Sequence, residues 1–231
     1  MSKVVGVMGG MGPAATVDFM SKVIALTPAE KDQDHIRMLV DNNPTVPDRQ
    51  VAMASAGEDS GPVLVEMAVG LERAGADFLV MPCNTAHAWV DVIRDAVDIP
   101  LISIIDETVA ACAGYDAVGL LSTSGCLKSH VYQEGLEAGG KKVVLPDDAE
   151  VAEIMDLVFR VKAGDLVDEV FRRMAAVANA LARRGAEVVV AACTEIPLVL
   201  DEGIIDIPVI KSTDILAAAT VARARRGKFD V

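Results

Sequence analysis

Aromatic residues are scarce in this sequence: Phe, Trp and Tyr together make up 3% of its 231 residues. A core must therefore be built from aliphatic side chains and methionine, and hydrophobic residues reach 52% of the chain. Such a composition is typical of a parallel sheet that helices bury on both faces. The length is sufficient for one large domain or for two compact lobes, each with its own core.

Positive charge is also in short supply, because 21 Lys and Arg residues stand against 34 Asp and Glu residues, a formal net charge of −13. This balance argues against nucleic acid or an anionic membrane as a partner. No apolar run approaches the roughly 18 residues of a membrane span. The apolar stretch near the N-terminus is short and breaks into Gly-Gly-Met-Gly-Pro, so we interpret it as a strand and expect a cytoplasmic protein.

The four cysteines show no metal-ligand spacing such as Cys-x-x-Cys, and we expect no metal site. In a cytosolic protein all four are expected to be reduced thiols. Residues 10–15, Gly-Met-Gly-Pro-Ala-Ala, fit the dinucleotide pattern Gly-x-Gly-x-x-Ala. Pro13, however, removes an N–H where a pyrophosphate needs donors, so we favour no nucleotide and expect no cofactor.

Short apolar runs alternate with amphipathic stretches along the whole chain, a pattern that predicts parallel βαβ units. We predict strands at Val4–Met8, Ile36–Val40, Phe78–Met81, Leu101–Ile104, Val118–Leu121, Val143–Leu145, Val188–Ala192 and Val209–Ile210. We predict helices at Ala14–Ala25, Val63–Ala74, Ala86–Ala96, Val151–Val161, Val167–Arg184 and Asp214–Arg225.

The second half of the chain repeats the first. The segment that ends at Cys83 aligns with the segment that ends at Cys193, and two further segments align in the same order at nearly the same offset. We predict two similar α/β lobes, each with a parallel sheet flanked by helices, related by a pseudo-twofold axis with a cleft between them. The first lobe is predicted to hold residues 1–103 plus 211–231, because the last helix returns to it, and the second residues 104–210.

Cys83 and Cys193 occupy equivalent positions, each directly after a predicted strand. Ligands of open α/β sheets bind beyond the carboxyl ends of the strands, so facing lobes would direct both thiols into one cleft from opposite sides. Helix-starting residues follow each cysteine, and a helix N-terminus lowers the pKa of a nearby thiol. The alternative is that both cysteines are buried remnants of a duplication.

Two opposed thiols suit the inversion of a stereocentre. A base removes a proton from one face and an acid delivers a proton to the other, which a group with a pKa near the working pH can do. No lysine site for pyridoxal phosphate is evident. Hydrogen-bond donors around the substrate carboxylate would therefore have to stabilise the carbanion.

Five strings carry a resemblance to a known family. They are Gly-Gly-Met-Gly-Pro at 9–13, Asn-Asn-Pro at 42–44, Pro-Asp-Arg at 47–49, Met-Pro-Cys-Asn-Thr-Ala-His at 81–87 and Cys-Thr-Glu at 193–195. The sequence resembles the aspartate/glutamate racemase superfamily over essentially its whole length, and most of all its pyridoxal-independent aspartate racemases. The resemblance implies a cofactor-independent racemase of an acidic amino acid, with aspartate favoured, that forms a homodimer.

Several alternatives stay open. Related enzymes act on glutamate or on a broader range of amino acids, and hydantoin racemases and maleate isomerases share the superfamily. A protein that binds an amino acid without catalysis is a further possibility, and a dinucleotide-dependent oxidoreductase is the most distant one.

The resemblance also implies roles for single residues. Cys83 and Cys193 match the two catalytic cysteines, the first acting on the D enantiomer and the second on the L enantiomer. Arg49 and Lys162 match the cations that bind the side-chain carboxylate, which argues for an acidic substrate. The other residues expected to contact the substrate are Met11, Asp48, Asn84, Thr85, Thr123, Ser124, Thr194 and Glu195.

Four of the residues near the predicted site allow two interpretations. Asp48 either contacts the substrate amino group or fixes its loop, and Glu195 either tunes Cys193 or caps a helix. His87 could pair with Cys83 as in Cys-His nucleophiles, but we favour a supporting or surface role. Cys126 stands where the family often has threonine, and we favour a buried packing residue over a third reactive thiol.

Overall fold

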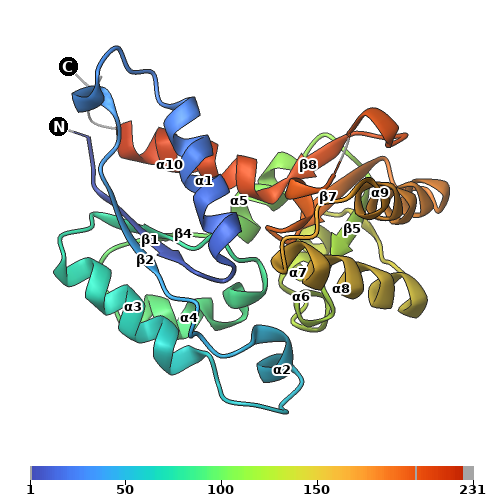
Figure 1. Ribbon diagram of the computed structural model, residues 1–231, viewed down its shortest axis with the longest axis horizontal. Coiled ribbons are helices and arrows are strands. Elements are labelled where there is room, and N and C mark those ends of the chain that lie inside the picture. Colours follow the sequence, from blue (N-terminus) through green and yellow to red (C-terminus); the bar gives the residue numbers. More distant parts are fainter. Residues whose placement is uncertain (1, 201, 226–231) are drawn as a thin grey trace.

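The computed structural model describes residues 2–200 and 202–225. Two four-stranded sheets form the framework of two lobes (Figure 1), with strand orders β2-β1-β3-β4 and β6-β5-β7-β8. Every strand pair within them is parallel. The second order repeats the first with all numbers raised by four, and the predicted fold of two similar α/β lobes is confirmed.

All eight predicted strands are present, with ends shifted by up to two residues. The central strands are buried along their whole length, which explains why they read as continuous apolar runs. The bounds are β1 (Val5–Gly9), β2 (Met38–Asn42), β3 (Phe78–Val80), β4 (Leu101–Ile102), β5 (Ala117–Ser122), β6 (Lys142–Val144), β7 (Val188–Ala192) and β8 (Val209–Lys211).

The helices include four that the sequence pattern misses: α2 (Arg49–Met53), α5 (Ile104–Ala111), α6 (Ser124–Lys128) and α7 (Val131–Ala138). The predicted helix at Ala86–Ala96 is instead a 3-10 segment, Thr85–Trp89, followed by α4 (Val90–Arg94). The remaining helices are α1 (Pro13–Leu26), α3 (Gly61–Arg73), α8 (Asp148–Lys162), α9 (Asp168–Arg183) and α10 (Ser212–Arg225).

Helix α5 begins where the sequence predicts the end of a strand. The hydroxyl of Ser103 accepts a hydrogen bond from the backbone N–H of Asp106 and so caps the first turn. β4 therefore ends at Ile102, and Ile104 is the first residue of the helix.

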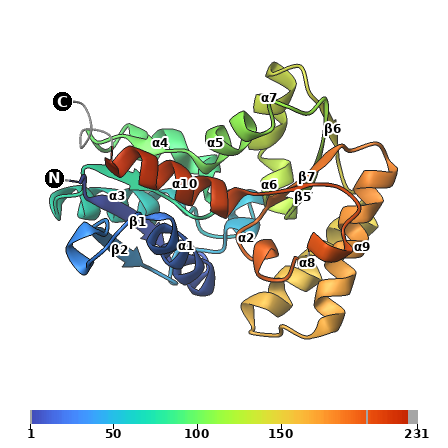
Figure 2. The same cartoon turned by 90° about the horizontal axis from the view of Figure 1, so that it is seen from above.

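One hydrophobic core runs through both lobes. It joins Val5 and Phe78 of the first sheet to Val118 and Val188 of the second, and Leu216 of α10 belongs to the same cluster. Helix α10 packs against α1 and α5, as Figure 2 shows from above. The boundaries of the two lobes stay a prediction, and residues 226–231, assigned to the first lobe, lie outside the described residues.

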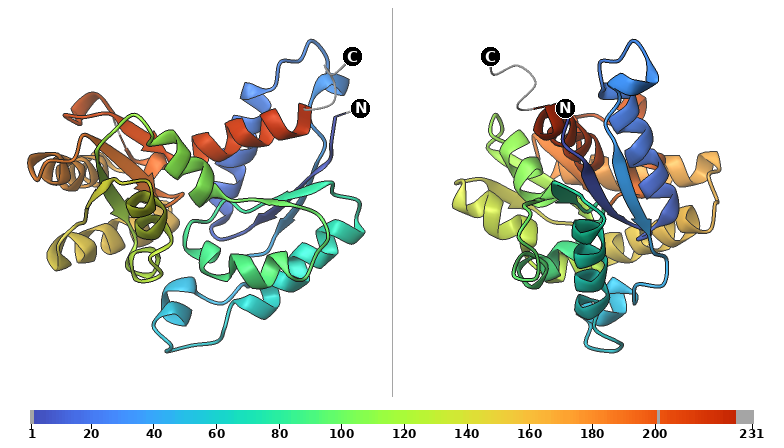
Figure 3. Two further views of the ribbon diagram at one scale, coloured as in Figure 1. Left: turned by 180° about the vertical axis from the view of Figure 1, so that it is seen from behind. Right: turned by 90° about the vertical axis from the view of Figure 1, so that its left-hand side faces the viewer.

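The topology decides where a ligand can bind. In each sheet the chain leaves its first strand, β1 or β5, toward one side and later returns to the other, at β3 or β7. The loops that follow these strands flank the point where strand order reverses, which is the ligand crevice of open α/β sheets. Helix α2, the light-blue segment that projects from the first lobe in Figure 3, contacts α6 of the second lobe across this region.

Within the described part of the chain, no helix combines the length and the apolar character that crossing a membrane requires.

Candidate active site

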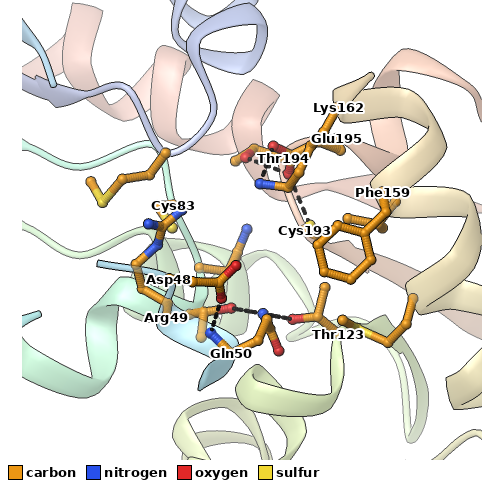
Figure 4. A pocket seen from close by; sticks show the side chains of 15 residues that line it. Asp48, Arg49, Gln50, Cys83, Thr123, Phe159, Lys162, Cys193, Thr194 and Glu195 are labelled. Carbon is orange, nitrogen blue, oxygen red and sulfur yellow. Dashed lines mark hydrogen bonds and ion pairs between the residues drawn. The ribbon is translucent and has the colours of Figure 1, made fainter. Parts of the chain in front are cut away.

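A cavity lies between the lobes, and both Cys83 and Cys193 line it. Figure 4 shows Cys83 on one side of it, among elements of the first lobe, and Cys193 on the opposite side. The two residues are 6% and 8% exposed. This first cavity has a volume of about 30 Å³, room for a few water molecules.

The structure gathers eleven of the twelve predicted site residues around this cavity. They come mainly from loops at the carboxyl ends of strands in both sheets, which explains why residues far apart in sequence meet. The eleven are Met11, Asp48, Arg49, Cys83, Asn84, Thr85, Thr123, Lys162, Cys193, Thr194 and Glu195. Ser124 is the exception, and its hydroxyl donates a hydrogen bond to Oε1 of Gln50 at 3.2 Å.

The thiol of Cys193 donates a hydrogen bond to Oε2 of Glu195 at 3.1 Å. Burial, and then the negative charge of Glu195, raise the pKa of Cys193 well above its ordinary value, while Lys162 offsets part of this effect. The expectation of a lowered pKa is wrong for Cys193. The element that follows it is only a 3-10 turn, Ile196–Leu198, so burial outweighs any dipole.

Glu195 connects Cys193 to both lobes. Its other oxygen, Oε1, lies 3.0 Å from Nζ of Lys162 at the end of α8 and accepts the backbone N–H of Gly12 at 3.2 Å. A Cβ at position 12 would lie 3.1 Å from the same oxygen, so glycine allows this close approach. Glu195 therefore holds the thiol instead of capping a helix.

Lys162 is charged in this arrangement. Burial lowers its pKa, but the negative charge of Glu195 and the hydrogen bond to it raise it, and the net change is upward. The ammonium group is thus already paired with a buried carboxylate before any substrate arrives. The assigned contact of Lys162 with a substrate carboxylate stays a prediction.

Asp48 and Arg49 begin helix α2. The carboxylate of Asp48 accepts hydrogen bonds from the backbone N–H groups of Gln50 at 2.7 Å and Val51 at 3.3 Å, a capping arrangement that fixes the loop. Nη1 of Arg49 donates hydrogen bonds to the carbonyl of Val46 at 3.0 Å and to the carbonyl of Pro47 at 2.9 Å. These bonds hold the guanidinium at the edge of the cavity.

Gln50 is a site residue that the sequence analysis missed. Its Nε2 donates to the hydroxyl of Thr123 at 3.0 Å, and its Oε1 accepts the backbone N–H of Gly125 at 2.6 Å. Figure 4 shows the side chain between the two lobes. The only hint in the sequence is the capping residue Asp48, because a glutamine in a polar stretch looks like a surface residue.

Helix α8 supplies an apolar wall that was also missed. Met155, Val158 and Phe159 line the first cavity. Phe159 remains 48% exposed. These positions are in the predicted helix, but its pattern does not reveal that they face a cleft.

Asn84 and Thr85 follow Cys83 and are buried. The Oδ1 of Asn84 accepts a hydrogen bond from the hydroxyl of Tyr132, and its Nδ2 donates to the hydroxyl of Ser212 at 3.2 Å. The hydroxyl oxygens of Thr85 and Thr123, one from each lobe, lie 3.2 Å apart. Asn84 therefore links its loop to α7 and α10 through these two bonds, in addition to lining the first cavity.

His87 is buried and supports the loop that carries Cys83. Its Nδ1 donates to the carbonyl oxygen of Cys83 at 2.8 Å, and its Nε2 accepts the backbone N–H of Ile104 at 3.2 Å. Both nitrogens thus bind backbone rather than the thiol, and burial lowers the pKa of His87 to about 4. A surface position is excluded, and the supporting role remains.

The other two cysteines are packing residues. Cys126 is 1% exposed within the core cluster, and burial raises its pKa to about 12. Cys112 belongs to the same cluster, and burial raises its pKa to about 11. Neither thiol ionises near neutral pH, which agrees with the packing role expected for Cys126.

The fold and the site define a two-lobed α/β enzyme whose cleft combines side chains of both lobes. The sequence model of the Asp/Glu/hydantoin racemase family matches residues 8–220, and the chain belongs to this family. It is therefore a racemase, an isomerase, as the resemblance in the sequence implied.

Relatives of known structure or activity agree with this assignment. The aspartate racemase of Picrophilus torridus is 34% identical, with a TM-score of 0.87 over 96% of this chain and 94% of that one. A broad specificity amino-acid racemase of Bacillus subtilis is 30% identical over 226 residues, 94% of this chain and 96% of the relative. A glutamate racemase of Francisella tularensis, solved with D-glutamate, is 16% identical with a TM-score of 0.72 over 98% of this chain and 82% of that one, and supports the fold alone.

Proposed function

We propose that this racemase inverts the Cα of aspartate without a cofactor, by proton transfer between Cys83 and Cys193. The observation that carries the proposal is the position of these two thiols on opposite sides of one cavity, at equivalent places in the two lobes. Aspartate is favoured because the relative from Picrophilus torridus is an aspartate racemase. A homodimer in the cytoplasm is part of the proposal, and both points remain predictions.

In this mechanism one sulfur removes the Cα proton as a base, and the other donates a proton to the opposite face of the planar carbanion. Burial and Glu195 raise the pKa of Cys193 and so favour its thiol form, which suits it to donate a proton when Cys83 acts as the base. The family resemblance gives D as the enantiomer that Cys83 deprotonates. One turnover reverses the two roles.

The carbanion needs donors around the α-carboxylate. The hydroxyls of Thr85 and Thr123 lie beside each other at the cavity, and residues of the loops after β3 and β7 line it. Groups that are already oriented stabilise developing charge without a cost of reorganisation. We propose that these two loops hold the α-carboxylate from both sides.

Deuterium exchange tests the proposal. L-Aspartate is incubated in deuterated water with dialysed protein and no added cofactor, and the enantiomers and the Cα label are followed by chiral chromatography and NMR. We expect D-aspartate that carries deuterium at Cα. Binding of aspartate that raises the thermal stability without any exchange would instead indicate a non-catalytic amino-acid-binding protein.

A broader substrate range is the second candidate. The relative from Bacillus subtilis is described as a broad specificity amino-acid racemase. In this chain the ammonium of Lys162 is already paired with Glu195 at 3.0 Å, which weakens the preference for an acidic side chain that Lys162 would otherwise create.

A further inference from the structure

A second cavity, of about 390 Å³, adjoins the first. Asp48, Arg49, Lys162 and Glu195 line both cavities and so form a partition between them. The second cavity has more than ten times the volume of the space between the thiols. Arg49 and Lys162, to which the family resemblance assigns the substrate side chain, are part of this partition.

The partition carries no net charge, because its two cations stand against two carboxylates. The Nζ of Lys162 lies 3.0 Å from Oε1 of Glu195, and Nη1 of Arg49 is bonded to the carbonyl of Val46 at 3.0 Å. Each cation therefore has a partner within the protein. An ionised substrate side chain would have to compete with these contacts for the two cations. An uncharged substrate side chain does not compete for them.

Beyond the partition the side chains that line the second cavity are apolar. Pro13 and Ala14 come from the first turn of α1, Val46 from the loop after β2, Val161 from α8 and Leu198 from the turn after β7. Such walls favour hydrocarbon, since burying each CH₂ group is favourable. A long side chain would find in this cavity the room that the first cavity lacks.

We propose that the second cavity is a side-chain subsite, which adds α-amino acids with long, uncharged aliphatic side chains to the substrates. The Cα of such a substrate lies between the thiols, and its side chain passes between Arg49 and Lys162 toward Ala14 and Leu198. This inference rests on the proposed racemisation, and it names a substrate class for the same site.

The test compares Cα deuterium exchange of 2-aminohexanoate with that of aspartate, in the wild-type protein and in the variant Ala14→Phe. Ala14 is exposed at the start of α1, so a phenyl ring there extends into the second cavity without disturbing the core. We expect the wild type to exchange both amino acids. In Ala14→Phe the ratio of kcat/KM for 2-aminohexanoate to that for aspartate should fall at least about tenfold.

Val17→Phe is the matched control, because Val17 is on the same helix, is 61% exposed and does not belong to either cavity wall. Its ratio should equal that of the wild type. Circular dichroism checks the fold, and Ala14→Leu replaces Ala14→Phe if the larger ring prevents folding.

Three results would overturn the subsite. The wild type could exchange aspartate but not 2-aminohexanoate, which leaves the proposed racemisation intact. Ala14→Phe could slow both amino acids equally, as expected if the second cavity is only the entrance to the first. Absence of exchange with both amino acids would overturn the proposed racemisation itself, and the subsite with it.

Discussion

One carboxylate oxygen of Glu195 accepts a hydrogen bond from the thiol of Cys193 at 3.1 Å, and the other forms an ion pair with Lys162 at 3.0 Å. A buried negative charge beside a thiol opposes ionisation of that thiol. The two cysteines are equivalent in sequence, yet this contact gives Cys193 an environment of its own. The symmetric repeat therefore builds a site whose two halves differ in charge.

Replacing Glu195 by glutamine should shift the pH profile of kcat/KM for only one of the two enantiomers. The wild-type pKa of Cys193 is raised, so its thiolate forms only at high pH, and removal of the charge should let it form at lower pH. For the enantiomer that Cys193 deprotonates, L by the family resemblance, the rising limb of kcat/KM should move to lower pH in Glu195→Gln. Glu137→Gln, at an exposed carboxylate on α7, is the control, and identical profiles in both variants would refute the role of Glu195.

Loss of Lys162 should destabilise the fold through Glu195. Lys162→Met leaves a buried carboxylate without its cation, and we expect the free energy of unfolding in urea to fall by roughly 1–3 kcal/mol. The double variant Lys162→Met, Glu195→Gln should recover part of this loss, because the charge is then absent. If the loss in the double variant equals the sum of the losses in the two single variants, Lys162 and Glu195 are not coupled.

Gln50 should hold the cleft closed. Gln50→Ala removes the acceptor of the Gly125 backbone N–H, a bond of 2.6 Å that links α2 to α6. We expect amide hydrogen exchange at Gly125 to accelerate about tenfold, the equivalent of about 1.4 kcal/mol. The exposed Gln33 provides the control Gln33→Ala. An unchanged exchange rate at Gly125 in Gln50→Ala would show that the hydrogen bond of Gln50 does not hold the cleft closed.

His87 should make the protein less stable in mild acid. Its pKa is about 4 in the folded protein against an ordinary value of 6.5, so between these values the unfolded chain binds a proton that the folded protein does not. Stability should therefore fall as the pH decreases through this window, by roughly 3 kcal/mol from this residue alone.

His87→Gln can keep a donor and an acceptor in place and should flatten the pH dependence. The measurement is urea unfolding at several pH values between about 4 and 7. His130→Gln, at an exposed histidine, should leave the dependence as it is. A variant His87→Gln with the same slope as the wild type would contradict the assignment.

The sequence predicts those parts of the molecule that depend on local pattern or on the repeat. Apolar runs such as Val188–Ala192 mark the buried strands, and the alignment of Cys83 with Cys193 places both at the ends of equivalent strands. Gln50 could not be found in this way, because its partner Gly125 is 75 residues away. Only the folded chain brings them together.

The surroundings of a side chain, which set its pKa and its hydrogen-bond partners, also cannot be predicted from the sequence. A helix start after Cys193 suggests a lowered pKa, but burial and Glu195 reverse the direction. Asn84 is predicted to contact the substrate, and the sequence does not show that its amide is also bonded to Tyr132 and Ser212, which lie 48 and 128 residues away. Such effects arise from tertiary contacts that no local pattern records.

The most direct test of two opposed bases is Cα deuterium exchange in the variants Cys83→Ser and Cys193→Ser, each with pure D- and pure L-aspartate. Neither variant should interconvert the enantiomers, because one of the two proton carriers is missing. Each should still exchange the Cα proton of one enantiomer without inversion: D-aspartate in Cys193→Ser and L-aspartate in Cys83→Ser. Exchange of the same enantiomer by both variants, or continued racemisation in either, would contradict proton transfer between sulfurs on opposite faces of the substrate.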